Sequence, residues 1–151
     1  MIDRKARDEL SVLVKAFVTG RITNYEYESD IPSSQDRIIK VVDDYVWSYY
    51  HDLKEHNMPK GSFTLTSKRE FARIILFLNS DREYLWPENL PLKSRLKKLF
   101  LATEPVQGRR IKDFAFHDAG DLAVWPFLHR KHMMAETNKS RVGLSLTLAE
   151  S

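Results

Sequence analysis

The chain has 151 residues, of which 42% are hydrophobic and 30% charged, and its net charge is +3. A chain of this length folds by default as one domain, and it can bury enough surface to be stable without disulfides or metals. The absence of cysteine excludes a disulfide framework, a thiol nucleophile, an iron–sulfur cluster and cysteine-ligated zinc. We therefore expect a single domain over residues 1–151.

The first ten residues, MIDRKARDEL, mix acids with bases and lead into no apolar run, which is unlike a signal peptide. Every apolar run is far shorter than the roughly 20 residues that a membrane-spanning helix needs. The sequence therefore predicts no membrane association and a cytoplasmic location.

The first predicted helix covers residues 3–19, because its apolar residues recur at three- and four-residue spacing. Gly20 stands where a helix C-terminus favours glycine. Thr23 and Glu26 then make a capping box, which predicts a short second helix that ends before Pro32.

The main predicted element is a helix over about residues 34–56, which no glycine or proline interrupts. At about 100° per residue its apolar side chains fall within one wide arc. A face this broad is typical of a central packing helix. We therefore predict a mainly α fold, a helical bundle arranged around this long helix.

Further helices are expected after a capping box at Ser67 and Glu70, over residues 91–102, and over residues 121–138. Three segments instead show the alternation of apolar and polar residues that is typical of strands. A small β element is therefore a further expectation, formed by residues 62–66, 112–117 and 142–149.

Trp47 projects from the predicted central helix on the side opposite its apolar arc, among charged residues. A tryptophan in such a setting can anchor a protein partner, because indole rings are enriched among the residues that dominate binding energy. Asp44 and His51 are the polar residues expected beside it. The alternative is that another helix covers Trp47, since large aromatic side chains are usually buried.

Asp52 and His56 are four residues apart, so on a continuous helix their side chains would meet. Together with Tyr49 they could line a ligand pocket, where the pair would act as an acid–base couple. The structural alternative is that Asp52 accepts a hydrogen bond from His56 at the end of the buried face. No nucleophile is visible beside the pair, so we assign no catalytic residue.

His129 and His132 are three residues apart, and with a carboxylate such histidines can hold a divalent cation. Their spacing is not that of a metalloprotease helix, and Arg130 and Lys131 between them would repel a cation. The phosphate-binding patterns GxGxxG and Walker A are absent, as is the GxSxG elbow. We therefore predict no metal site and no cofactor.

Positive charge is concentrated between residues 93 and 112. The candidate contacts to nucleic-acid phosphates are Lys93, Lys97, Lys98, Arg109 and Arg110. The lysines alternate with leucines as on an ordinary surface helix, and no aromatic platform for stacking bases accompanies them. A nucleic-acid accessory role is therefore an alternative to binding another protein.

Two motifs carry a resemblance: W-x-Y-Y-x-D-x-x-x-H at residues 47–56 and FLNSDREYLWP at residues 77–87. Together they resemble a group of small, helical, uncharacterised bacterial proteins, over about residues 34–90. The resemblance implies a bacterial cytoplasmic setting and brings no activity, cofactor or catalytic residue. From the absence of a reactive constellation, the polar surroundings of Trp47 and the uneven charge, we expect a non-catalytic protein-binding module of the immunity or accessory type. The alternatives are a small enzyme or ligand-binding protein that uses Asp52 and His56, and the nucleic-acid role.

Overall fold

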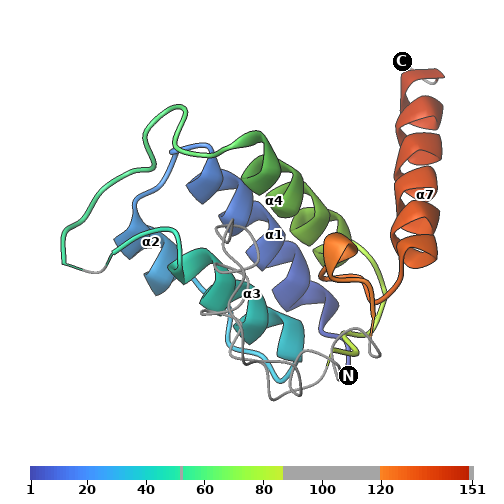
Figure 1. Ribbon diagram of the computed structural model, residues 1–151, viewed down its shortest axis with the longest axis horizontal. Coiled ribbons are helices and arrows are strands. Elements are labelled where there is room, and N and C mark those ends of the chain that lie inside the picture. The colour runs from blue at the N-terminus through green and yellow to red at the C-terminus, as the bar shows by residue number, and fades with distance from the viewer. Residues whose placement is uncertain (52, 87–119, 150–151) are drawn as a thin grey trace, which may run out of the picture.

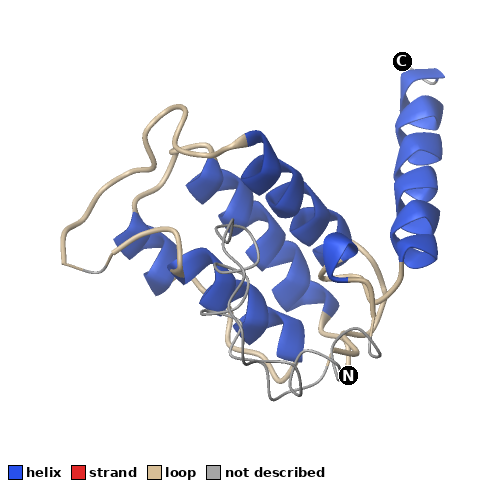
Figure 2. Cartoon of the chain, in the orientation of Figure 1, coloured by secondary structure: helices blue, strands red, loops and turns tan. Residues whose placement is uncertain are grey.

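The computed structural model describes residues 1–51, 53–86 and 120–149, with side chains up to residue 141. Within these ranges the protein is mainly helical and contains no strand (Figure 2). The prediction of a mainly α fold is therefore confirmed. None of the helices in the described ranges combines the length and the apolar character needed to cross a lipid bilayer.

The described helices pack side by side with α1 in the middle. In chain order they are α1 (Arg4–Val18), α2 (Asn24–Ser29), α3 (Arg37–Trp47), α4 (Leu65–Leu78), the 3₁₀ turn η1 (Leu122–Val124) and α7 (Arg130–Ala149). Figure 1 shows α1 between α3 and α4, and α7 projecting beside the end of α4. Because α1 contacts α2, α3 and α4, it is α1, rather than the predicted helix 34–56, that organises the others.

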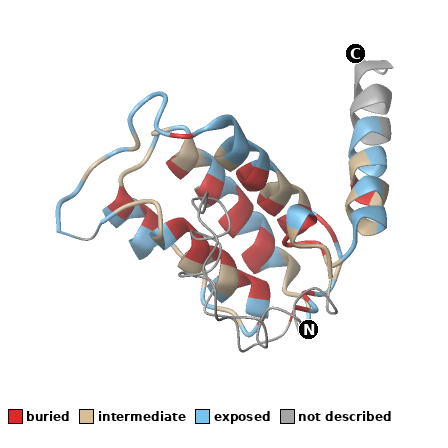
Figure 3. Cartoon of the chain, viewed as in Figure 1, coloured by how far each residue is buried: buried red, intermediate tan, exposed pale blue. Residues whose placement is uncertain are grey.

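The boundaries of α1 and the residues that it buries follow from its sequence. The side chain of Asp3 caps its N-terminus by accepting a hydrogen bond from a first-turn amide. Leu10, Val14 and Phe17 are fully buried, and their spacing is the one that predicted a helix over residues 3–19. Figure 3 shows the buried residues of α1, α3 and α4 gathered where these helices meet.

The short helix α2 starts with the predicted capping box. The amide of Glu26 donates to Thr23 Oγ1 at 3.1 Å, and the amide of Thr23 donates to Glu26 Oε2 at 2.7 Å. Each residue thus satisfies a backbone donor that the first turn of a helix leaves unpaired. The helix ends at Ser29, before Pro32.

The uninterrupted helix predicted over residues 34–56 is wrong at both ends, because α3 has only 11 residues. It begins after Asp36, whose side chain caps the helix. It ends at Trp47 and is followed by the cap residue Ser48, whose hydroxyl donates to the carbonyl of Tyr45 at 2.6 Å. A serine that bonds to the backbone in this way competes with helix continuation. The apolar face within α3 is nevertheless buried as predicted, with Val42 fully enclosed.

The predicted β element is also wrong where the structure describes it. Residues 62–66 lead into α4, whose cap is Thr64 rather than the expected Ser67. Residues 142–149 belong to α7, in which leucines four residues apart suit a helix as well as their alternation suits a strand. Residues 112–117 lie outside the described ranges.

The helix predicted over residues 121–138 is divided into η1 and α7. The division falls at Trp125 and Pro126, where the backbone of Trp125 is extended. A residue before proline is sterically driven out of the helical region, and proline itself offers no amide hydrogen. The helical pattern therefore resumes only at Arg130.

Gly20 ends α1 with a φ of +70°, and a Cβ there would lie 2.6 Å from the backbone oxygen of Met58. Gly61 has a φ of +86°, but a Cβ there would meet no atom within 4 Å. We expect Gly61→Ala to lower the free energy of unfolding by about 1 kcal/mol, and Gly20→Ala by about 2 kcal/mol, because the loop at Met58 must also move. Urea unfolding of both variants measures this difference. Equal losses would show that the close approach of Met58 costs nothing.

Candidate partner-binding face

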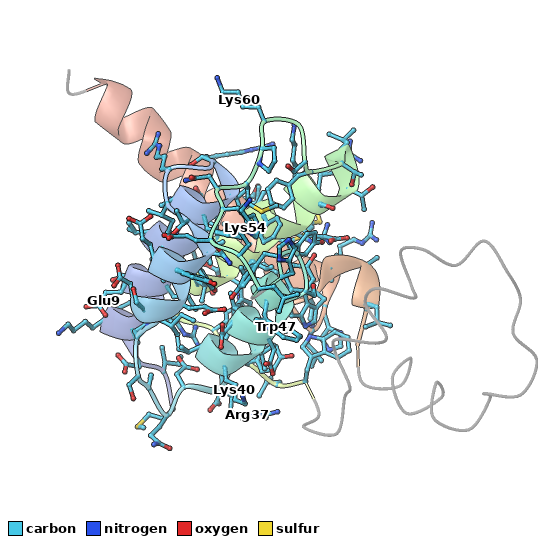
Figure 4. The ribbon with its side chains drawn as sticks, turned by 90° about the vertical axis from the view of Figure 1, so that its left-hand side faces the viewer. Glu9, Arg37, Lys40, Trp47, Lys54 and Lys60 are labelled. Carbon is cyan, nitrogen blue, oxygen red and sulfur yellow. The ribbon has the colours of Figure 1, made fainter. Side chains whose placement is uncertain are left out.

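Trp47 is the last residue of α3, and 39% of its surface is exposed. The two other tryptophans, Trp86 and Trp125, are 0% and 3% exposed. In Figure 4 Trp47 faces the viewer, with Lys40 on one side and Lys54 on the other. The indole thus lies on the outside of the helix, as the sequence predicts, and no helix of the described ranges buries it.

Charges of both signs accompany the indole on α3. Lys40 Nζ lies 3.9 Å from Asp44 Oδ2, and the two side chains are one helical turn apart. Asp44 itself is half-buried and lies three residues before Trp47, on the same side of the helix. An ion pair at this distance with an exposed lysine contributes little to stability, so a charge on a partner can compete for Lys40 at little cost.

The loop after α3 is held in place by the buried side chain of Asn24. Asn24 Nδ2 donates to the carbonyls of His51 and Lys54, at 3.2 and 3.3 Å. Asn24 Oδ1 accepts from the amide of His56 at 2.8 Å. The exposed ring of His51 packs on that of His56, with 4.8 Å between ring centroids. The predicted partner-binding residue His51 therefore sits on a loop that is fastened to α2.

Two residues of the predicted ligand pocket, Tyr49 and His56, do not share a helix. Because α3 ends at Trp47, the four-residue spacing of Asp52 and His56 no longer implies that their side chains meet on a helix. Asp52 itself lies outside the described residues. The hydroxyl of Tyr49 is 2.8 Å from that of Tyr45. His56 Nδ1 is instead 2.8 Å from the carbonyl of Lys54. Tyr49 and His56 thus have different polar partners. The acid–base couple was predicted from two side chains one turn apart on a continuous helix, and α3 does not extend that far.

A buried polar cluster that the sequence did not reveal lies at the same end of α3. Its members are Tyr45, Tyr49 and Glu70 of α4, and Glu70 is only 3% exposed. Tyr45 donates its hydroxyl hydrogen to Glu70 Oε2. Burial and this hydrogen bond hold the pKa of Tyr45 well above its ordinary value, so the phenol stays a neutral donor. The cluster joins the end of α3, and with it Trp47, to α4.

The remaining predicted sites are only partly described. The basic residues Lys93, Lys97, Lys98, Arg109 and Arg110 lie outside the described ranges. The rings of His129 and His132 are 5.3 Å apart. Within the described part of the chain, no three metal-ligating side chains come together. These two histidines therefore have no described third ligand for a metal.

Comparison with protein-family models, curated proteins and solved structures gives no match for this chain. What the α3 face can bind must therefore be inferred from its own side chains. The α3 face consists of the exposed indole of Trp47, the ion pair of Lys40 and Asp44, and the ring of His51 on the loop that Asn24 holds by hydrogen bonds.

Proposed function

We propose that this protein is a non-catalytic binding protein of the bacterial cytoplasm, of the immunity or accessory type, which docks its α3 face onto another protein. The supporting observation is Trp47, an indole that keeps 39% of its surface exposed. Tryptophan is among the residues that contribute most to protein–protein binding, because it offers a large apolar area with few rotatable bonds.

The charges around Trp47 favour a protein partner over a polyanion or a lipid surface. Lys40 and Lys54 are positive, but Asp44 lies between Lys40 and Trp47 on the same helix. An aspartate at this position would repel phosphates, whereas a protein can place a complementary charge opposite each group. We expect the partner to have an apolar socket for the indole, with charges of both signs at its rim.

The face is also preorganised. The hydrogen bonds of Asn24 hold the loop that carries His51, and Tyr45 bonded to Glu70 fastens the end of α3. A surface already held in one conformation loses little entropy on binding. Leu53, 93% exposed on the same loop, supplies a second apolar side chain.

The proposal is tested by photocrosslinking in the host cell, with a photoreactive phenylalanine derivative at position 47. The matched control carries it at position 25, where Tyr25 of α2 is 41% exposed. We expect position 47 to give one dominant protein adduct that position 25 does not give. With that partner purified, Trp47→Ala should weaken binding about 30-fold, the effect of a central anchor residue.

Tyr25→Ala should change the same Kd less than about threefold, because Tyr25 lies on α2. Thermal unfolding should give similar Tm values for both variants, since neither side chain belongs to the core. Absence of a specific adduct at position 47, or equal weakening by both variants, would overturn the proposal.

A further inference from the structure

A hollow of about 220 Å³ opens between the end of α4, the residues after it and the start of α7. Its apolar lining consists of Phe77, Leu85, Phe127 and Leu128, and Arg82 and His132 add polar groups. None of these residues belongs to the α3 face, so binding in this hollow would be independent of the proposed function.

Two buried aromatic side chains form the base of the hollow. Phe77 is 2% exposed and Phe127 is fully buried, and their rings meet edge to face with centroids 5.0 Å apart. Leu85 also lines the hollow and is 57% exposed, so it offers apolar surface to a ligand. Four of the eight described lining residues are apolar and four are charged or polar, and a concave site that combines apolar surface with polar groups can hold a small molecule that has both.

Arg82 is positioned to bind an anion. Its Nε donates to Glu136 Oε1 at 2.9 Å, and Glu136 is itself mostly buried. Among the described residues nothing accepts a hydrogen bond from its two terminal nitrogens. The backbone of Arg82 is fixed as well, because its carbonyl accepts from Arg7 at 2.7 Å. Because the guanidinium of Arg82 is held through Nε, the N–H groups of Nη1 and Nη2 can donate to the two oxygens of a carboxylate.

The two acids that line the hollow, Asp81 and Glu83, each have a positive partner. Arg4 Nη1 lies 3.4 Å from Asp81 Oδ1, and the amino group of Met1 lies 3.1 Å from Glu83 Oε1. Both pairs are exposed and therefore only partly offset the negative charge. The N-terminal turn of the protein thus reduces the repulsion that an incoming anion would meet.

We infer that this hollow binds a small organic acid, with its apolar body against the accessible side chains of Leu85 and Leu128 and its carboxylate on Arg82 beside His132. The volume is below the roughly 300–1,000 Å³ of pockets for drug-sized ligands, which points to a monocarboxylate of about ten non-hydrogen atoms. A ligand of that size, with one charged contact, should bind with a Kd of about 0.1–1 mM.

Benzoate and hexanoate are the probes, titrated into the full-length ¹⁵N-labelled protein with amide shifts as the readout. We expect saturable shifts around Arg82, Phe127 and His132. Benzyl alcohol, which has the same ring without the charge, should bind at least tenfold more weakly. Equal binding of benzyl alcohol, or no shift of these amides at millimolar benzoate, would overturn the inference.

Arg82→Gln should weaken benzoate binding at least tenfold, while Arg69→Gln, at an exposed position of α4, should leave it within twofold. Because Arg82 also pairs with Glu136, Leu85→Asp gives a second test that leaves this ion pair intact. A carboxylate at the mouth should repel the probe and weaken its binding by a similar factor. Unchanged binding in Arg82→Gln and Leu85→Asp would place the probe elsewhere and overturn the inference.

Discussion

Replacement of Arg7 by methionine should lower the free energy of unfolding by about 3–5 kcal/mol, the usual cost of breaking a buried ion pair. Arg7 is fully buried in α1, and its Nε lies 2.6 Å from Asp36 Oδ2. Its Nη1 donates to the carbonyls of Ser80 and Arg82, at 3.0 and 2.7 Å. Methionine would fill much of the space but would leave the Asp36 carboxylate buried without its cation.

Urea unfolding followed by far-UV circular dichroism measures this loss, with Lys5→Met as the matched control. The Lys5 side chain is on the same helix but is 87% exposed, 3.9 Å from Glu9, so its loss should cost at most about 0.5 kcal/mol. Arg7→Lys should recover only part of the stability, because an ammonium group cannot reach Asp36 and both carbonyls at once. An Arg7→Met variant as stable as Lys5→Met would contradict this account of the core.

The same contact contributes to the loss of stability in acid. Burial pushes the pKa of Asp36 upward, but the hydrogen bonds from Arg7 and from the amide of Asp3 outweigh it and leave that pKa below its ordinary value. A carboxyl group whose pKa is lowered by folding stabilises the native state above its unfolded pKa of about 3.9. This stabilisation is lost as the pH falls through the folded-state pKa. We expect the free energy of unfolding to fall less steeply between about pH 5 and pH 2 in Arg7→Met than in wild type.

Local signals in the sequence were sufficient to predict the first two helices, α1 and α2. The apolar spacing of α1 and the Thr23–Glu26 capping box both involve residues within one or two turns of each other. The exposed position of Trp47 followed from the same periodicity, because it lies opposite the face that Val42 and Val46 bury.

The end of α3 could not be predicted because local preferences do not decide it. No residue between 34 and 56 forbids a helix, and the bond from the Ser48 hydroxyl to the carbonyl of Tyr45, which accompanies the end of α3, is open to a serine within a helix as well. The next aromatic residue, Tyr49, finds its polar partners in Tyr45 and Glu70. Glu70 is 21 residues away in the chain, so no local pattern could reveal this contact.

The buried charges were missed for a related reason. Arg7 lies three and seven residues before Leu10 and Val14, and Glu70 lies four and seven residues before Ile74 and Phe77. These spacings place both charged residues on buried faces. This was a usable signal, but the partner of Arg7 is 29 residues distant in the chain. Sequence periodicity can therefore place a charge in the core without identifying the group that stabilises it.

The second large effect is expected at Tyr45, where removal of the hydroxyl in Tyr45→Phe should lower the free energy of unfolding by about 3 kcal/mol. Glu70 Oε2 would lose the hydroxyl of Tyr45 and, of its described partners, retain only the hydroxyl of Tyr49, at 3.4 Å. Glu70 Oε1 already has no hydrogen-bond partner among the described residues. The variant would therefore leave a buried carboxyl group almost without donors, which is far more costly than the loss of one ordinary hydrogen bond.

Tyr27→Phe is the matched control, because the hydroxyl of Tyr27 is also buried but finds no partner in the described part of the protein. Its removal should be neutral or should stabilise by up to about 1 kcal/mol. Glu70→Leu should cost less than Tyr45→Phe, since Tyr45 and Tyr49 can still bond to each other. Combining Tyr45→Phe with Glu70→Leu should then recover about 2 kcal/mol relative to the sum of the single losses. Strict additivity in chemical unfolding would mean that Glu70 and Tyr45 do not depend on each other, and that the end of α3 is held by aromatic packing alone.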